Sequence, residues 1–433
     1  MKPGDTVQVI TKDETLEGIL IPSPELEKDT VILKLDSGYN IGIDKKHIKK
    51  IATVKSSTEK KAASAPSVKQ NKNLPTISIM HTGGTIASKV DYKTGGVTAG
   101  YSPDEMLQMI PELHDIANVR SRKIISLQSE MIRFPHYNAL AKEIEKEIKK
   151  GCDGIIITHG TDTLHYTAAA LAFMIENSPI PIILVGAQRS FDRGSSDASL
   201  NWINAAYFAA HADFSGVAIC MHETSDDNNC LILPATKTRK MHTSRRDAFR
   251  PINTTAIARI NYQEEKISFI QKKHKKRNKE KVAVTLMNDK LKIGFLKSHI
   301  NMFAAEIDFY KDFDGLVLEG TGLGHMPNEE VDEHTKENKK IQEAIANLVK
   351  SGVVVVMTPQ TIYGRIQMNV YTPQRELLEV GVLGNFNDMT PETTFIKLAW
   401  LLSNFKKDEV KDLLSKNLRG ELTDRTEEHT FLV

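Results

Sequence analysis

The first fifty residues alternate between apolar and polar side chains in short runs. Four such runs cover residues 6–10, 16–21, 30–35 and 39–43, and turn-forming Pro, Ser, Asp and Gly residues separate them. Alternating runs bounded by turn signals are typical of antiparallel β-strands. We therefore predict that residues 1–54 form a small β-barrel.

A stretch without apolar periodicity follows, over residues 55–75. It is rich in Ser, Lys, Ala and Asn. This composition is typical of flexible linkers, because such side chains do not build an apolar core. The stretch therefore predicts a boundary between the small barrel and the rest of the chain.

After residue 75, short apolar runs alternate with longer helical patterns. The expected strands are 77–80, 123–127, 154–158, 181–186 and 216–220, and the expected helices are 102–110, 136–150, 163–176 and 197–211. Alternation of this kind predicts an α/β domain with a doubly wound, mostly parallel sheet covered on both faces by helices. We assign residues 76–270 to this larger domain.

A smaller α/β domain is predicted over residues 291–433, after a linker at 271–290. Its expected strands are 292–296, 315–318 and 353–357. The linker contains a basic run over residues 271–281, which fits a solvated loop but also a contact with RNA phosphates. We expect the polar tail from residue 420 onward to be a frayed terminus, unless a partner covers it.

Composition narrows the classes of function. The 433 residues are 40% hydrophobic and 26% charged, with a formal net charge of +2, which gives no general argument for nucleic-acid or membrane binding. The three cysteines are odd in number and widely spaced, which argues against a disulfide framework and fits a reducing compartment. No signal peptide and no apolar run of membrane-spanning length is visible, so we expect a cytoplasmic protein without a membrane anchor.

Two glycine turns carry the candidate chemistry. The first reads HTGGT over residues 81–85 and the second HGTDT over residues 159–163, and each follows a predicted strand. Ligands of open α/β sheets bind at the carboxyl ends of strands, so Thr85, Thr161 and Asp162 would share one pocket. Considered alone, a threonine in such a turn more often caps or closes the turn than acts in catalysis.

The sequence TGGTIA at residues 82–87, followed by HGTDT, resembles the two active-site signatures of the bacterial-type L-asparaginase family. The resemblance extends over about residues 76–405. It implies the two-domain asparaginase fold and hydrolysis of a side-chain amide. It also implies that one threonine, either Thr85 or Thr161, forms an acyl-enzyme, and the sequence leaves open which one.

The roles of the site residues follow from the same resemblance. Thr85 would attack the carboxamide, while Thr161, Asp162 and Lys240 would form a hydrogen-bonded triad that activates the nucleophile or the deacylating water. Asp162 would also help to bind the α-amino group of the substrate. Ser129, in the sequence LQSE, resembles the substrate-binding serine of the family.

The lysine assignment rests on spacing within the family pattern. The family has its active-site lysine nine residues before the phenylalanine of an Ala-Phe pair, as Lys240 stands before Phe249. Lys237, three residues earlier in a Thr-Lys-Thr sequence, is the competing candidate. A lysine can take up a proton only when its neutral form is accessible, which burial beside another donor favours. The strand-end segment GAQRS, residues 186–190, also resembles the family, and we interpret it as a structural turn.

Stand-alone asparaginases do not usually carry a barrel and a linker in front of the body. The SH3-like barrel, the asparaginase-like body and the tail TDRTEEHTFL together resemble the asparaginase-like subunits of archaeal glutamyl-tRNA(Gln) amidotransferases. This implies that the chain releases ammonia from glutamine or asparagine and passes it to a partner, the amidotransferase E subunit. The E subunit would use ATP and Mg²⁺ to convert glutamyl-tRNA(Gln) into glutaminyl-tRNA(Gln).

The resemblance further implies a homodimer within a heterotetramer, and no cofactor or metal in this chain. Two alternatives stay open at this point. A stand-alone cytoplasmic L-asparaginase would have no need of residues 1–54. A non-catalytic RNA-binding scaffold would have no need of the intact candidate side chains, since a fold alone does not establish a function.

Overall fold

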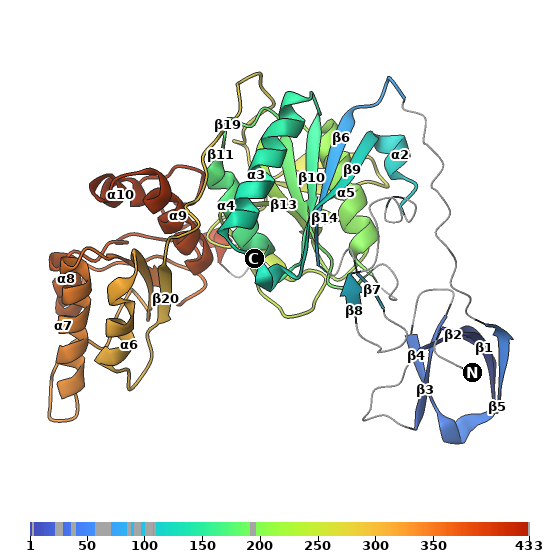
Figure 1. Cartoon of the computed structure of the whole chain (residues 1–433), viewed down its shortest axis with the longest axis horizontal. Coiled ribbons are helices and arrows are strands. Elements are labelled where there is room, and N and C mark those ends of the chain that lie inside the picture. The colour runs from blue at the N-terminus through green and yellow to red at the C-terminus, as the bar shows by residue number, and fades with distance from the viewer. Residues whose placement is uncertain are drawn as a thin grey trace.

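The computed structural model describes residues 1, 4–21, 29–35, 40–56, 71–84, 88–90, 97–99, 107, 110–190 and 196–431. Three sequence predictions lie wholly or largely outside these residues: the linker over 55–75, the helix at 102–110 and the candidate nucleophile Thr85. The described residues form an N-terminal β-domain, a larger α/β domain and a smaller α/β domain, coloured from blue to red along the chain in Figure 1.

The N-terminal domain is an antiparallel sheet of five strands in the order β4-β3-β2-β1-β5. Its elements are β1 (Thr6–Thr11), β2 (Thr15–Ile21), β3 (Thr30–Lys34), β4 (Asn40–Asp44), the 3-10 turn η1 (Lys45–His47) and β5 (Ile48–Lys55). Val7, Val9 and Leu33 are fully buried in a core that belongs to this domain alone.

The four predicted strands are confirmed as β1 to β4, but the prediction missed β5. Two consecutive lysines, Lys49 and Lys50, interrupt the alternation of this strand. The pairing of β5 with β1 also shifts register twice, near Thr6 and near Thr11. Such irregularities change which face a side chain occupies, so β5 has no period-two pattern to recognise.

The larger domain is built on an eight-stranded mixed sheet with the order β18-β17-β14-β13-β12-β10-β6-β9. Its parallel strands are β6 (Thr76–Gly83), β9 (Asn118–Leu127), β10 (Gly154–Thr158), β12 (Pro181–Val185) and β13 (Gly216–His222). These five confirm the predicted strands. Three antiparallel strands, β14 (Cys230–Pro234), β17 (Ala258–Asn261) and β18 (Lys266–Phe269), extend the sheet and were not predicted.

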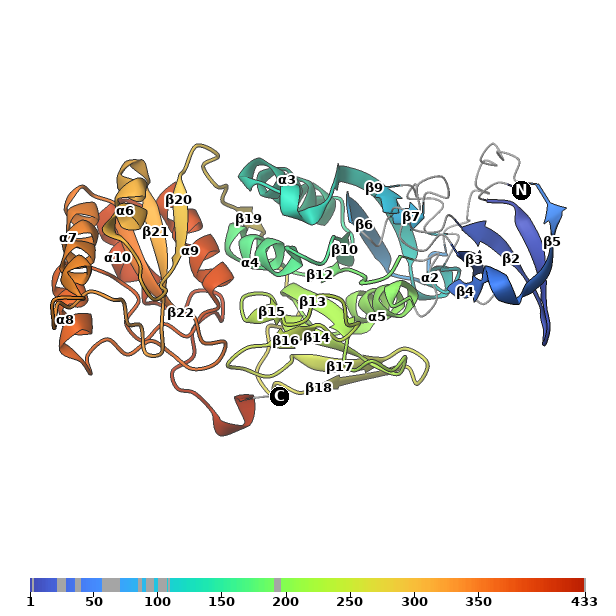
Figure 2. The ribbon, with the colours of Figure 1, turned by 90° about the horizontal axis from the view of Figure 1, so that it is seen from below.

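Side chains of the parallel strands alternate between two apolar clusters. On β10, Ile155 and Ile157 belong to one cluster, and Ile156 belongs to the other. The helices that supply the first cluster are α3 (Phe134–Lys149) and α4 (Leu164–Met174), and those that supply the second are α2 (Leu113–Ile116) and α5 (Ala198–His211). Figure 2 shows α3 and α4 on one side of the sheet and α5 on the other, as strands without polar faces require.

The strand order creates a switch point between β6 and β10. The chain passes from β6 to β9 on one side, and then crosses to β10 on the other side of β6. Loops that leave two such strands at their carboxyl ends diverge, and ligands of open α/β sheets bind in the crevice between them. Both candidate glycine turns lie at this switch point.

The smaller domain contains a parallel sheet in the order β20-β21-β22. Its strands, β20 (Ile293–Lys297), β21 (Gly315–Gly320) and β22 (Val354–Pro359), confirm the three predicted ones. Its helices are α6 (Ala304–Asp308), α7 (Lys336–Lys350), α8 (Thr372–Glu379), α9 (Pro391–Asn404) and α10 (Lys407–Leu414).

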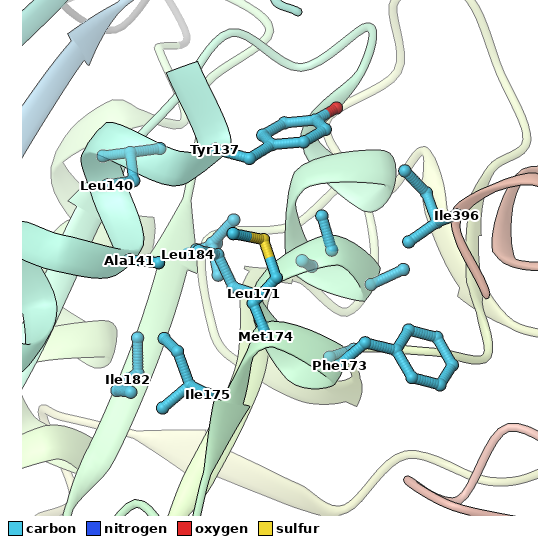
Figure 3. Packing of buried hydrophobic residues seen from close by; sticks show 14 of the residues in the cluster. Tyr137, Leu140, Ala141, Leu171, Phe173, Met174, Ile175, Ile182, Leu184 and Ile396 are labelled. Carbon is cyan, nitrogen blue, oxygen red and sulfur yellow. The ribbon is translucent and has the colours of Figure 1, made fainter. Parts of the chain in front are cut away.

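Helix α9 joins the two α/β domains through a shared apolar cluster. Ile396 of α9 packs in the same cluster as Leu171 and Met174 of α4, as Figure 3 shows. Phe173 of α4 stacks on Trp400 of α9 with 5.5 Å between ring centroids. Full burial of each large apolar side chain stabilises the fold by about 1.5–3 kcal/mol, so the seam between the domains is a packed interface.

Short elements complete the described part of the chain. Three pairs of short antiparallel strands are β7 (Ser88–Val90) with β8 (Val97–Ala99), β11 (Ile175–Glu176) with β19 (Ala283–Val284), and β15 (Thr238–Lys240) with β16 (Phe249–Pro251). The remaining 3-10 turns are η3 (Ser129–Met131), η4 (Phe309–Asp312) and η5 (Glu428–Thr430). Among the described helices, none is long and apolar enough to cross a membrane.

The basic run over 271–281 is anchored to the larger domain at several residues. Its lysines are exposed, as expected of a solvated loop. Arg277, in contrast, donates to the carbonyl oxygens of Ala209 (2.6 Å), Ala212 (2.8 Å) and Asp153 (2.6 Å). The last carbonyls of a helix lack partners within it, so Arg277 supplies donors at the end of α5.

The C-terminal tail, taken from here on as residues 418–431, is docked on the two domains, so the expectation of a frayed terminus was wrong. Figure 2 shows this red segment returning from the smaller domain toward the larger one. The guanidinium of Arg419 donates hydrogen bonds to the carbonyl oxygen of Ala172 (3.1 Å) and to the carboxylate of Glu176 (2.6 Å), both in the larger domain. Farther along, the ring of Phe431 packs edge-on against Tyr363, with centroids 5.4 Å apart.

Candidate active site

The two glycine turns are in backbone contact. A Cβ atom on Gly84 would lie 2.3 Å from the Cα of Gly160. Gly84 also has a φ of +78°, which side chains other than glycine rarely adopt. Thr85, which follows Gly84, lies outside the described residues. The contact therefore places the residue before Thr85 against the residue before Thr161.

Lys240 reaches these turns from the hairpin of β15 and β16. In the hairpin register Lys240 pairs with Phe249, which is fully buried. The amide of Met241 donates to the carbonyl oxygen of Ala248 (2.6 Å) one step beyond this pair. Lys240 and Phe249 are nine residues apart because they face each other as the last pair before the loop of the hairpin. Burial of Phe249 therefore fixes the backbone position of Lys240.

The Lys240 ammonium bridges the two candidate residues of the second turn. It donates to Thr161 Oγ1 at 2.9 Å and to Asp162 Oδ1 at 2.8 Å. The Lys240 side chain is 10% exposed, whereas that of Asp162 is 67% exposed. An ion pair with such an exposed partner contributes about 1 kcal/mol or less to stability. The arrangement therefore contributes little to stability. It links a hydroxyl, an ammonium and a carboxylate beside the N-terminus of α4, where negative charge is favoured.

Ser129 lies beside the same turn. It is buried and begins η3, directly after β9. A Cβ on Gly160 would lie 2.9 Å from Ser129 Oγ. Thr163 Oγ1 donates to the carbonyl oxygen of Ser129 at 2.6 Å, which ties the two segments together. The structure thus gathers Ser129, Thr161, Asp162 and Lys240 at neighbouring strand ends.

Gln188 is a polar neighbour that the sequence analysis missed. The turn 186–190 is structural as expected, because the buried Asp197 carboxylate accepts from the amides of Gln188 and Arg189 at 3.0 Å. The Gln188 side chain, however, accepts a long hydrogen bond from Thr161 Oγ1 (3.4 Å). Its buried Nε2 atom has no partner in the described part of the chain. The sequence signal that could have identified Gln188 was its position just after the predicted strand at 181–186, since that strand is the neighbour of β10 in the sheet.

Lys237, the competing lysine, points away from this site. It is fully buried, and it donates to Asp388 Oδ2 at 2.9 Å and to the carbonyl oxygen of Glu421 at 3.3 Å. Burial lowers the pKa of the Lys237 ammonium, against the opposing effect of the Asp388 carboxylate. Lys237 therefore connects the larger domain to the smaller domain and the tail, and of the two lysines it is Lys240 that contacts the second turn.

The histidines that open the two turns are structural. His81 hydrogen-bonds Thr158 Oγ1 (2.9 Å) and Ser121 Oγ (2.8 Å), and His159 hydrogen-bonds Thr167 Oγ1 (2.8 Å). Burial lowers the pKa of each histidine to about 4, so both rings are neutral at pH 7. Across the described residues, no cluster of three or more His, Cys, Asp or Glu side chains could hold a metal ion.

A cavity of about 440 Å³ opens beside Lys240. Its lining includes Asp162, Tyr166, Arg239 and Glu392. Arg239 Nε and Glu392 Oε1 form an ion pair at 3.1 Å, which crosses from β15 to α9. This volume falls in the usual range for small-molecule sites, so an amino acid can be accommodated here.

Comparison with known families matches all three parts of the chain. Residues 1–54 match the GatD N-terminal domain, residues 76–275 the asparaginase N-terminal family and residues 292–414 the glutaminase/asparaginase C-terminal domain. The chain is 43% identical to the D subunit of the Methanococcus maripaludis glutamyl-tRNA(Gln) amidotransferase over 428 residues, which cover 98% of this chain and 99% of that protein. The chain belongs to the GatD family, the D subunits of glutamyl-tRNA(Gln) amidotransferases.

Other relatives and solved structures agree with this assignment. The D subunit of the Pyrococcus furiosus enzyme is 42% identical over 446 residues, which cover 99% of this chain and 97% of that protein. The thermostable L-asparaginase of Thermococcus kodakarensis aligns over 81% of this chain and 100% of its own, with a TM-score of 0.71 and 29% identity. L-asparaginase I of Vibrio cholerae aligns over 81% and 99%, with a TM-score of 0.69 and 26% identity. This GatD family member therefore carries an asparaginase/glutaminase-type amidohydrolase body.

Proposed function

We propose that this chain is the ammonia-producing subunit of a tRNA-dependent amidotransferase. It hydrolyses the side-chain amide of glutamine or asparagine. The observation that carries the proposal is the Lys240 ammonium, which joins Thr161 and Asp162 beside the contact of Gly84 with Gly160. The names of the relatives, which are D subunits of glutamyl-tRNA(Gln) amidotransferases, support the amidotransferase context.

Thr85 is the nucleophile in this proposal. Its hydroxyl oxygen forms a bond to the amide carbon. Its proton passes to the Thr161 hydroxyl, which passes its own proton to Lys240 as the Lys240 ammonium gives one to the Asp162 carboxylate. The carbon–nitrogen bond then breaks, and the nitrogen takes a proton from the network and leaves as ammonia. A water molecule hydrolyses the resulting ester, which releases the free acid and returns the proton to Thr85. Dividing one difficult step into two in this way is the general advantage of covalent catalysis.

Ser129 and Asp162 bind the amide donor. The buried Ser129 hydroxyl lies beside Gly160, and the exposed Asp162 carboxylate suits the α-amino group of an amino acid. The N-terminus of α4, with its unpaired N–H groups, favours the negative charge that develops on the carbonyl oxygen during attack.

The ammonia passes to an E subunit, which activates glutamyl-tRNA(Gln) with ATP and Mg²⁺ and forms glutaminyl-tRNA(Gln). In this proposal the chain itself uses no cofactor. Two copies of the chain assemble with two copies of the E subunit.

The test is ammonia release from glutamine and asparagine by the full chain, with and without the E subunit and glutamyl-tRNA(Gln). We expect a low rate for the chain alone and a higher rate with both additions. Full asparaginase activity that neither addition changes would instead identify a stand-alone amidohydrolase.

Variants assign the roles in the same assay. Thr85→Val and Lys240→Met should abolish ammonia release, and Thr161→Val should reduce it by about 100-fold or more. Lys149→Met is a matched control, because Lys149 is an exposed lysine of α3 that pairs with Glu145 of the same helix. Near wild-type activity of Thr85→Val would show that the nucleophile has been assigned to the wrong residue.

A further inference from the structure

The residues that lead up to Lys240 are bonded to the smaller domain. Three contacts join residues 236–239 to residues 388–393. They run from Thr393 Oγ1 to the carbonyl oxygen of Thr236 (2.9 Å), from Lys237 Nζ to Asp388 Oδ2 (2.9 Å), and from Arg239 Nε to Glu392 Oε1 (3.1 Å). The next residue is Lys240, so its position depends on the smaller domain as well as on its own hairpin.

The C-terminal tail binds the same residues. Thr423 donates to the fully buried Asp388 carboxylate twice, from its amide (3.1 Å) and from its hydroxyl. Lys237 Nζ donates to the carbonyl oxygen of Glu421 (3.3 Å). Thr236 Oγ1 donates to the carbonyl oxygen of Arg419 (3.3 Å). Asp388 and Lys237 therefore have their full set of partners only when the tail is docked.

A second buried ion pair secures the tail. Lys397 Nζ and Glu421 Oε1 are 2.6 Å apart, and both side chains are fully buried. The amides of Leu418 and Arg419 also donate to the Glu421 carboxylate, at 3.0 and 2.6 Å. A buried charge is tolerated only when it is paired and hydrogen-bonded in this way, so docking of the tail is specific.

The tail lies beyond the part of the body that resembles asparaginases in sequence. The match to the glutaminase/asparaginase C-terminal domain ends at residue 414. The contacts with Asp388 and Lys237 come from residues 421 and 423. The segment that completes the support of the Lys240 strand therefore lies outside the residues that this family model matches.

We propose that residues 418–424 of the tail are a positioning element for Lys240. Through Asp388 and Lys237, the docked tail fixes the strand from which Lys240 reaches Thr161 and Asp162. When the tail leaves, Asp388 loses two donors and the strand loses the part of its support that the tail supplies, so Lys240 moves out of hydrogen-bonding distance. A displacement of about 1 Å at a catalytic group can lower a rate by about 100-fold. This inference rests on the proposed amide hydrolysis.

The experiment compares Thr423→Val with Thr423→Ser in the full chain, assayed for ammonia release under the conditions in which the wild type is most active. Valine has the shape of threonine without the hydroxyl, whereas serine keeps the hydroxyl. We expect Thr423→Val to lower kcat at least about tenfold and to change the KM for the amide donor by less than about twofold. Thr423→Ser should retain the wild-type kcat. Hydrogen exchange of the peptide covering residues 236–251 should increase in the valine variant only.

Thr335→Val is the control for general destabilisation. Thr335 Oγ1 accepts from the amides of Val331 and Asp332, both at 2.9 Å, at the start of α7. It makes none of the contacts with residues 236–239 described above, so this variant should lose thermal stability and keep its kcat. Equal losses of kcat in Thr335→Val and Thr423→Val at equal Tm would overturn the inference.

Two further variants keep the result decisive. Arg365 donates to the carbonyl oxygen of Thr423 (2.9 Å) and its side chain is 22% exposed, so Arg365→Met weakens tail docking and serves if Thr423→Val does not fold. We expect it to lower kcat about threefold.

Lys240→Met separates the two proposals. If it remains active, the proposed function fails, whereas a wild-type kcat in Thr423→Val beside an inactive Lys240→Met would refute only the role of the tail.

Discussion

Gly84 and Gly160 pack backbone to backbone, so that a Cβ on Gly84 would lie 2.4 Å from the amide nitrogen of Gly160. Real Cβ atoms do not approach backbone atoms so closely. The two turns that carry Thr85 and Thr161 can therefore lie together only because each has a glycine at the point of contact. Gly84 of TGGT is thus explained by a contact between two segments that are far apart in the sequence, whereas a Cβ on Gly160 would first meet Ser129.

This contact predicts that Gly84→Ala strongly lowers the rate of ammonia release. The added Cβ would meet backbone rather than a flexible side chain, so the two turns must separate. We expect kcat to fall by about 100-fold, because catalytic groups tolerate little displacement. Steady-state ammonia release at saturating donor is the measurement.

Gly151→Ala is the matched control for backbone strain. Gly151 has nearly the same φ, +77°, but a Cβ there would meet nothing within 4 Å. We expect a loss of about 1–2 kcal/mol in the free energy of unfolding, from the left-handed backbone alone, with unchanged activity. Similar loss of activity in both alanine variants would contradict the role of the contact.

The buried histidines predict a loss of stability in acid. The pKa of His81 and of His159 is about 4 in the folded chain, against about 6.5 in the unfolded chain. The unfolded chain therefore binds more protons between these two values. The stability contributed by the neutral rings is complete above about pH 6.5 and is lost as the pH falls toward 4, by about 1.4 kcal/mol per pH unit for each histidine.

Urea unfolding between about pH 4.5 and pH 7 checks this prediction. His159→Gln should flatten the pH dependence of the free energy of unfolding in this window. His334→Gln, at a largely exposed histidine, should leave the dependence unchanged. An unaltered slope in His159→Gln would show that His159 does not titrate as its burial requires.

The cysteines are predicted to be unreactive in the folded chain. Cys152, Cys220 and Cys230 are buried and free. Burial raises the pKa of Cys152 to about 12 and that of Cys230 well above its ordinary value, and the thiolate is the reactive form. A chromogenic thiol reagent should label none of them at pH 7 and all of them in urea. Rapid labelling of one cysteine before unfolding would refute this.

Deleting residues 1–54 should leave the amidohydrolase body folded. The apolar core of the N-terminal domain shares no residue with the clusters of the body within the described ranges. We expect the truncated chain to keep its Tm within about 3 °C and to keep its activity on the free amide donor. Circular dichroism and the ammonia assay measure both properties. Aggregation or early melting would show that the N-terminal domain stabilises the body.

The sequence predicted the central parallel strands β10 and β12 well because they carry continuous apolar side chains. Ile155, Ile156 and Ile157 need helices on both faces of the sheet, and nothing else fits such a run. Strands β17 and β18 lie outside the parallel core and include charged residues such as Arg259 and Lys266, so they carry no comparable signal.

The candidate site was predictable in its residue types, but not in its geometry. Spacing alone left Lys237 and Lys240 as rivals. Lys237 lies in the turn before β15 and Lys240 is the last residue of β15, and the structure directs Lys240 toward Thr161 and Lys237 toward Asp388. Docking of the tail was not predictable either, because the partner of the buried Glu421 carboxylate is Lys397, on helix α9.

The stacking of Phe173 on Trp400 has a consequence for how the amide donor enters and leaves. Separating the two α/β domains would expose these rings and the apolar cluster around them to water, so the halves of the body move as one piece. The two α/β domains therefore do not open about a hinge, as the two lobes of a hinged binding protein do. Exchange of donor and product has to occur through local rearrangement at the carboxyl edge of the sheet, on the far faster timescale of loop motion.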